Sequence, residues 1–358
     1  MKNIFRIITV VALTFVLSMS AVVAGNDDRR GTAGATELLI NPWARSAGWG
    51  AVSVANSRGL ESFYTNIAGL SFIHSTEVVY SYSSYFGGKG GLNSGASINA
   101  FGLGQRLFER GVAGVYVMTM SVGEIPVTTV ESPEPGVAGV FSPSIMNINV
   151  AYSHSFTASI HGGVVLKVIS ESTSDISGNG FGLDAGIQYV SGVNDELKFG
   201  IALKNIGPSM SFGGTGLSFT FRNAAGNPMT GEFRSAEMEL PTSLSIGASY
   251  DFHLNDDAQQ LLTVAGAFTS NAFLKDNFAL GVEWSGWDRV MLRAGYVAQR
   301  NIFSSTERTT ANTGFSAGAS FKVPMGKKED APSLELDYAY RMAANLKGTH
   351  TIGAVIRL

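Results

Sequence analysis

The chain has 358 residues, of which 15% are charged, 45% are hydrophobic and 43 are glycine. An ordinary soluble domain carries roughly 25% charged residues and about 7% glycine. This composition is therefore unusual for a soluble enzyme and is typical of a β-rich protein with one face in lipid. The hydrophobic content excludes an intrinsically disordered chain. The net charge of -3 provides no basic field for nucleic acid, and the absence of cysteine excludes disulfides, thiolate metal sites and cysteine nucleophiles.

The N-terminus has the pattern of a secretory signal. Lys2 and Arg6 precede an apolar run over residues 7–17, and small residues at 22–24 suit cleavage by a signal peptidase. We therefore expect residues 1–24 to be a cleaved signal peptide for Sec-type export. An N-terminal membrane anchor is the alternative, but the run is short for a span of about 20 residues. No later stretch of about 18 apolar residues predicts a helical span.

From Thr76 onward the hydrophobic pattern has a period of two. Between residues 181 and 189, apolar side chains at odd positions alternate with glycine and polar side chains at even positions. Such alternation predicts strands with one apolar and one polar face. About fourteen such runs occur. The predicted strands are 76–86, 95–104, 111–123, 144–156, 159–172, 179–190, 197–206, 241–254, 260–270, 276–284, 289–299, 313–322, 333–342 and 349–358.

Strand length and number favour a membrane barrel. Most of the runs have about 9–13 residues, as tilted membrane strands do, whereas soluble strands average about 5–6. We therefore expect an all-β fold in which residues 76–358 form a transmembrane antiparallel β-barrel of about fourteen strands in the outer membrane. A secreted β-sandwich is the main alternative, but the polar-face positions are mostly small residues that suit a crowded lumen. Two soluble domains are less favoured, because no linker divides the alternating region.

The connections between the predicted strands support this topology. If the chain enters the barrel from the periplasm, the longest connections, at 124–143, 207–240 and 300–312, all face outward. Short connections such as 156–159 and 191–196 then face the periplasm, which is the asymmetry expected of such barrels. The connection at 324–332 is longer than a typical periplasmic turn.

Residues 25–75 do not follow the alternating pattern. Short helices are predicted near residues 36–40 and 61–70, and the segment contains Trp43 and Trp49. Its apolar content predicts an ordered plug or gasket, against the periplasmic mouth of the barrel or inside it. The two tryptophans either pack this segment into the barrel or face a partner. Arg45 is expected to hold the segment through a salt bridge or a carbonyl contact.

A series of motifs resembles the PorV/PorQ family of FadL-like outer-membrane barrels, which are common in Bacteroidetes. GTAG at 31–34, ARSAGWG at 44–50 and NIAGL at 66–70 resemble the family's elements before the first strand. KNIGP at 204–208, ELP at 239–241, LRAGY at 292–296, DYAY at 337–340 and GTH at 348–350 follow in the family's order. The family pattern differs here at Ile67, Trp49 and Leu358, where proline, methionine and a terminal aromatic residue are usual. The motif residues singled out are Trp43, Arg45, Gly48, Trp49, Gly50, Asn66, Ala68, Gly69, Leu70, Asn205, Gly207 and Pro241.

The resemblance implies two kinds of non-enzymatic work. PorV-like proteins serve as accessory subunits of type IX secretion, so the resemblance implies a translocon or secreted cargo as partner. FadL-like relatives instead admit small hydrophobic molecules, which makes a conduit the alternative function. Membrane lipid is an expected partner in either case, and nucleic acid is not.

No catalytic or cofactor site is expected. The five histidines are scattered without ligand spacing, and no glycine-rich phosphate loop precedes a helix. Trp284 and Trp287 lie at the inward end of a predicted strand pair, where an interfacial aromatic girdle is favoured over a sugar-binding platform. By parity, Asp184, Lys204 and Glu283 are expected to face the lumen.

Overall fold

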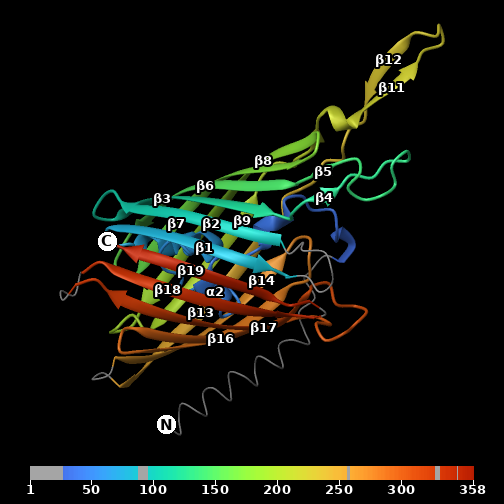
Figure 1. Cartoon of the computed structure of the whole chain (residues 1–358). Coiled ribbons are helices and arrows are strands. Elements are labelled where there is room, and N and C mark those ends of the chain that lie inside the picture. Colours follow the sequence, from blue (N-terminus) through green and yellow to red (C-terminus); the bar gives the residue numbers. More distant parts are fainter. Residues whose placement is uncertain (1–26, 88–95, 256–258, 327–330, 345) are drawn as a thin grey trace.

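The computed structural model describes residues 27–87, 96–255, 259–326, 331–344 and 346–358, so the expected signal peptide at 1–24 lies outside the described residues. Within these residues, fourteen long antiparallel strands form one barrel wall (Figure 1). They are β1 (Thr76–Tyr85), β2 (Ala96–Arg106), β3 (Gly111–Ser121), β6 (Ser144–Ser155), β7 (Ile160–Thr173), β8 (Ile176–Ser191), β9 (Leu197–Ile206), β13 (Ser243–Asn255), β14 (Gln260–Asn271), β15 (Asn277–Gly286), β16 (Val290–Gln299), β17 (Asn312–Pro324), β18 (Ser333–Ala343) and β19 (Thr349–Arg357).

The sheet closes on itself because its first and last strands pair. β1 pairs with β19 over residues 77–84 of β1, and each other wall strand pairs with its neighbours along the chain. The pairing of β8 with β9 shifts between Leu183 and Ala185, where β9 ends. Beyond that point the short strand β10 (Phe212–Gly213) continues along the edge of β8. The all-β barrel expected from the sequence, with its fourteen wall strands, is confirmed.

The two faces of the wall differ as the period of two requires. On β8 the side chain of Ile187 is 57% exposed on the outside, whereas that of its neighbour Gln188 is 1% exposed in the lumen. Outward positions elsewhere carry large apolar side chains such as Phe199, Leu166 and Ile352. The outer face is thus an apolar surface, and the inner face is mostly polar or small.

The two ends of the barrel also differ. The short-turn end carries the turns at 107–110, 156–159, 192–196 and 287–289. The long-loop end carries the connections at 122–143 and 207–242. These contain strands that the sequence analysis treated as loops: β4 (Ile125–Pro126) with β5 (Val140–Phe141), and β11 (Ser218–Arg222) with β12 (Pro228–Glu232). Figure 1 shows the β11–β12 hairpin projecting far beyond the wall.

Residues 33–73 fill the interior of the barrel, and we call them the plug. Near the long-loop end, Gly34 N–H donates to Glu239 O at 2.9 Å. Near the short-turn end, Arg106 Nε donates to Ile73 O at 2.9 Å. The plug therefore runs through the lumen from one end to the other and is not confined to one mouth.

Short helices make up much of the plug. They are the 3-10 helices η2 (Thr36–Leu39) and η3 (Ile67–Phe72) and the α-helices α2 (Ala44–Ala47) and α3 (Ser62–Thr65); the 3-10 helix η1 (Asp27–Arg29) precedes them, and η4 (Thr215–Leu217) lies in the loop before β11. Among the described residues, no helix has the length and apolar character needed to cross a bilayer.

Candidate functional site

Glycines on both sides let the plug backbone approach the barrel wall. A β-carbon on Gly48 would lie 2.9 Å from the Cα of Gly318 on β17, which is closer than real β-carbons come. The backbone of Trp49 crosses Gly295 on β16 in the same way. Gly50 has a φ of 75°, a left-handed conformation that favours glycine, and it turns the chain away from this contact. Three residues of the ARSAGWG motif thus dock the plug against β16 and β17.

One side of the lumen is an apolar contact between plug and wall. Trp43 is fully buried, and its ring centroid lies 5.0 Å from that of Tyr116 on β3. Leu60 and Leu70 are also fully buried in this cluster, against Val79 of β1 and neighbouring strands. Burying each such large side chain stabilises the docked plug by roughly 1.5–3 kcal/mol. Trp49 is also buried, beside Val52 and Val54 of the plug, so both tryptophans pack inside the barrel.

A second contact between plug and wall is a charged network. Arg45 Nη2 lies 3.2 Å from Glu283 Oε1 on β15, and Arg45 Nη1 lies 3.6 Å from Glu335 Oε1 on β18. Arg293 of β16 also pairs with Glu283, and Arg357 Nη1 lies 2.6 Å from Glu335 Oε2. Burial alone would lower the pKa of Arg45, but the two carboxylates raise it above its ordinary value, so Arg45 stays charged. This network binds the plug to the wall electrostatically.

A buried carboxylate orders the helix that carries Arg45. Glu61 accepts hydrogen bonds from the backbone N–H groups of Arg45, at 3.2 Å, and of Ser46, at 2.8 Å. These are first-turn donors of α2 that have no partner within the helix. Burial raises the pKa of Glu61, while the positive charge of Arg45 opposes that rise. The sequence analysis did not single out Glu61, because nothing in its local pattern places it beside residues 45 and 46.

The NIAGL motif makes a second docking point, against β8 and β9. Asn66 Nδ2 donates to Val54 O at 2.8 Å and to Ile187 O of β8 at 3.0 Å, while its Oδ1 accepts from Ala68 N at 3.2 Å. Gly69 leaves no room for a β-carbon, because Ser57 O occupies that position. The motif therefore holds the last part of the plug against β8.

The mid-barrel motif lies where β8 and β9 separate. Asn205 has a φ of 58°, and its N–H donates to Asp184 Oδ1 at 2.7 Å. Its side chain accepts from Lys167 Nζ at 2.6 Å and donates to Pro241 O at 3.1 Å. Gly207 passes against Phe181 O with no space for a side chain. These contacts hold the end of β9 and the start of the long loop in one arrangement.

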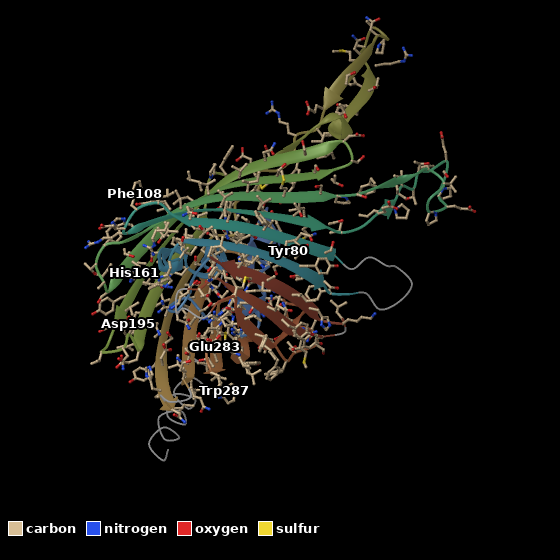
Figure 2. The ribbon with its side chains drawn as sticks, turned by 60° about the vertical axis from the view of Figure 1, so that its left-hand side comes forward. Tyr80, Phe108, His161, Asp195, Glu283 and Trp287 are labelled. Carbon is tan, nitrogen blue, oxygen red and sulfur yellow. The ribbon has the colours of Figure 1, made fainter. Side chains whose placement is uncertain are left out.

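The tryptophans outside the plug occupy a different region. Trp284 and Trp287 lie at the short-turn end of β15 with ring centroids 5.7 Å apart, and Trp287 is well exposed. Figure 2 shows Trp287 at the same end of the barrel as Phe108 and Asp195. Neither tryptophan takes part in the plug.

A cavity of about 520 Å³ lies between the plug and the strands β9 and β13 to β18, in the half of the lumen nearer the long-loop end. Ala51, Val54 and Tyr64 of the plug form one wall of this cavity. Across it lie lumen-facing residues near the long-loop ends of the strands: Lys204, Ser243, Ser245, Thr269, Asn271, Asn277, Gln299, Asn312, Ser316 and Arg341. Its volume falls in the range of pockets for small organic ligands, about 300–1,000 Å³.

A pair of carboxylates at the long-loop end was missed by the sequence analysis. Glu37 of η2 is 4% exposed and lies beside Glu171 of β7. Burial, followed by the negative charge of Glu171, raises the pKa of Glu37 to about 7. No sequence signal brings these two residues together, since they meet only when the plug is inside the barrel. Among the described residues, no group of three histidine or acidic side chains forms a metal site.

Comparison with known proteins bears on the fold. No protein-family model matches the sequence, and no curated protein does. Among solved structures, the CymD monoaromatic hydrocarbon channel matches with a TM-score of 0.55 and 15% identity, over 89% of this chain and 97% of that one. The Pseudomonas putida toluene transporter TodX matches with a TM-score of 0.54 and 12% identity, over 88% and 97% of the two chains. A Pseudomonas aeruginosa FadL homologue matches with a TM-score of 0.46, 13% identity and coverages of 87% and 96%.

The fold and the site together define a class of protein. The chain is similar in fold to the CymD channel and the TodX transporter: a closed antiparallel barrel, here with a plug and a cavity inside it. The FadL-like barrel fold that the resemblance implied is confirmed. The assignment to the PorV/PorQ family stays a prediction from the motifs.

Proposed function

We propose that this protein is a non-enzymatic, outer-membrane conduit for small molecules, with the cavity beside the plug as the binding chamber. The observation that carries the proposal is the cavity of about 520 Å³ enclosed in a barrel with an apolar outer face. The similarity in fold to the CymD channel and the TodX transporter supports it.

The apolar outer face supports placement in a membrane. Large outward side chains such as Phe199, Leu166 and Ile352 are between 46% and 62% exposed. Exposing an apolar surface of this kind to water would be unfavourable. Closure of the sheet leaves no unpaired edge for lipid to contact. Trp284 and Trp287 then form part of an aromatic girdle at the short-turn end. The expected signal peptide provides the export route.

The plug determines how a solute passes. Its apolar side and its charged network fill the lumen around the cavity, so the barrel is not an open pore. A solute enters the cavity from the long-loop end, where Ile302, Thr309 and Thr310 of the 300–311 connection line it. Further passage requires a local shift of the plug.

The test uses one cavity-filling variant and a neighbouring control. Ser316 lines the cavity, whereas the next residue, Ala317, is exposed on the outer face. We expect Ser316→Trp to slow uptake of labelled p-cresol and 4-hydroxyphenylacetate to the rate of a host without the protein. Ala317→Trp should leave uptake unchanged, because tryptophan is tolerated on an apolar outer face. The assay is whole-cell uptake in a porin-deficient bacterial host. Equal uptake by the two variants, or no uptake above the empty host, contradicts the proposal.

A second candidate function, accessory binding in type IX secretion, is supported by one observation besides the motifs. Phe219, Phe221 and Phe233 form an exposed aromatic cluster on the β11–β12 hairpin, with ring centroids of Phe219 and Phe233 4.4 Å apart. Such a surface suits a protein partner. Replacing Phe219 and Phe221 by serine should abolish recovery of a translocon or cargo protein from native membranes, while leaving solute uptake unchanged. Recovery that is unaffected removes this candidate.

A further inference from the structure

The cavity is lined by cations without carboxylates. Lys204 of β9 and Arg341 of β18 both line it, and no aspartate or glutamate is among its described lining residues. Other cations of the lumen pair with acidic residues, as Arg45 does with Glu283. The cavity therefore carries positive charge that no described lining carboxylate compensates.

Lys204 reaches toward the plug without an acidic partner. Its Nζ donates to Tyr64 O at 2.9 Å and lies 4.5 Å from the centroid of the Tyr64 ring. The carboxylate of Asp184, on the neighbouring strand, is taken by Lys167 at 2.7 Å. An ammonium has three donors, and the carbonyl of Tyr64 uses one of them. The remaining donors suit an anionic acceptor.

Arg341 provides the second positive charge near the same tyrosine. Burial raises the pKa of the Tyr64 hydroxyl to about 12, and the positive charge of Arg341 opposes that rise. No carboxylate in the described part of the chain forms an ion pair with Arg341. Lys204 and Arg341 thus place two positive charges on the wall of one cavity, one on β9 and one on β18.

A third feature points to a hydroxyl-bearing ligand. Asn312 lines the cavity, and its Oδ1 is buried without a hydrogen-bond partner among the described residues. A buried acceptor without a partner is unfavourable, and a donor on a ligand would satisfy it. Ser316 and Asn277 add further polar groups, while Val297 and Ile302 supply apolar surface. A pure hydrocarbon would leave the Asn312 acceptor unpaired.

We propose that the cavity binds a small hydroxylated organic acid, with its carboxylate between Lys204 and Arg341 and its hydroxyl donating to Asn312. The assignment deepens the proposed conduit function and rests on it for the route by which the acid enters. The apolar surface of the cavity holds the compact body of the ligand.

Four probes of similar size test the assignment on the unmodified protein. They are 4-hydroxyphenylacetate, p-cresol, which lacks the acid, tyramine, which carries an amine in its place, and phenylacetate, which lacks the hydroxyl. Titration calorimetry of the full chain in detergent should show 4-hydroxyphenylacetate binding at least tenfold more tightly than p-cresol. Phenylacetate should bind several-fold more weakly than the hydroxy acid, and tyramine most weakly of all. Binding of p-cresol or tyramine as tight as that of the acid, or no binding of the acid, overturns the proposal.

Single variants test whether Lys204 and Arg341 bind the carboxylate of the acid. Lys204→Met and Arg341→Met should each weaken binding of 4-hydroxyphenylacetate at least tenfold and leave p-cresol unchanged. Lys322→Met is the control, since Lys322 forms an exposed pair with Asp288 at 2.9 Å, away from the cavity. If Lys204→Met disturbs the plug, Arg341→Met alone still decides. Acid affinity equal to that of the unmodified protein in both cavity variants overturns the assignment.

The two proposals fail in different ways. If the acid binds but Ser316→Trp does not slow uptake, the conduit function falls and the binding site stands. If uptake requires the cavity but the acid shows no advantage in binding, the conduit stands and the ligand assignment falls.

Discussion

Gly48 of the plug and Gly318 of β17 meet without a side chain between them: a β-carbon on either glycine would lie 2.9 Å from the Cα of the other. The contact joins two residues that are far apart in the sequence. Both sides of the contact are backbone, so neither can yield as a flexible side chain would. This contact sets how closely the ARSAGWG motif docks against the wall.

Adding one methyl group at this contact should loosen the plug. We expect Gly318→Ala to lower the free energy of unfolding by about 1–3 kcal/mol, as overpacking usually does. Gly213→Ala is the control, because a β-carbon at Gly213 meets no atom within 4 Å. Urea unfolding followed by tryptophan fluorescence measures both variants. A Gly318→Ala protein as stable as the control would show that the two backbones are not in contact.

Removing the positive charge of Arg45 should destabilise the charged network. Arg45→Met leaves Glu283 and Glu335 with one arginine fewer, and we expect a loss of about 2 kcal/mol, since Arg45 is partly exposed. In the double variant Arg45→Met/Glu283→Gln the loss should be smaller than the sum of the two single losses. Unfolding free energies of the four proteins in this cycle provide the measurement. Additive losses would mean that the two residues do not interact.

The Glu37–Glu171 pair should make stability depend on pH. The folded-state pKa of Glu37 is raised to about 7 from an ordinary value of 4.5, so the folded protein holds a proton that the unfolded chain releases. Stability should therefore fall by about 3 kcal/mol as the pH rises from 4.5 to 7, and level off above that. Glu37→Gln should remove this fall. The measurement is the unfolding midpoint of both proteins at pH 5 and pH 8. Identical pH profiles of the two proteins would contradict a raised pKa for Glu37.

Charge on the outer face should cost more than charge in the lumen. Ile148 and Asn149 are neighbours on β6, with Ile148 facing outward and Asn149 buried inward. In a membrane barrel, Ile148→Arg should cost roughly 2–4 kcal/mol near the middle of the bilayer. Asn149→Arg should cost less where the lumen can accommodate it. Folding yields into lipid vesicles compare the two, and equal losses would speak against a lipid-facing Ile148.

Much of the fold was predictable because a barrel wall imposes a period of two. The predicted strand at 197–206 coincides with β9, and the predicted strand at 76–86 differs from β1 by one residue. The strands β11 and β12 were missed because they form a hairpin inside a loop, outside the wall. The period of the wall carries no information about such hairpins.

The site was less predictable than the wall. Motif residues such as Arg45 and Asn66 were identified, but their partners Glu283 and Ile187 come from distant strands. The path of the plug depends on close backbone contacts that no local pattern reports. Lys204 and Arg341 line the same cavity only because the barrel closes, and no local pattern in the sequence predicts this.

The position of the plug inside the barrel can be tested directly by a disulfide between the plug and the wall. A β-carbon on Gly353 of β19 would lie 3.2 Å from the Cβ of Ala44, near the spacing of about 3.5–4.5 Å in disulfides. The chain has no cysteine, so Ala44→Cys/Gly353→Cys introduces the sole thiol pair. We predict that mild oxidation of the folded protein in membranes forms this disulfide, seen as a mobility shift of the denatured chain that reduction reverses. A folded, membrane-inserted barrel in which both thiols stay free would contradict the account.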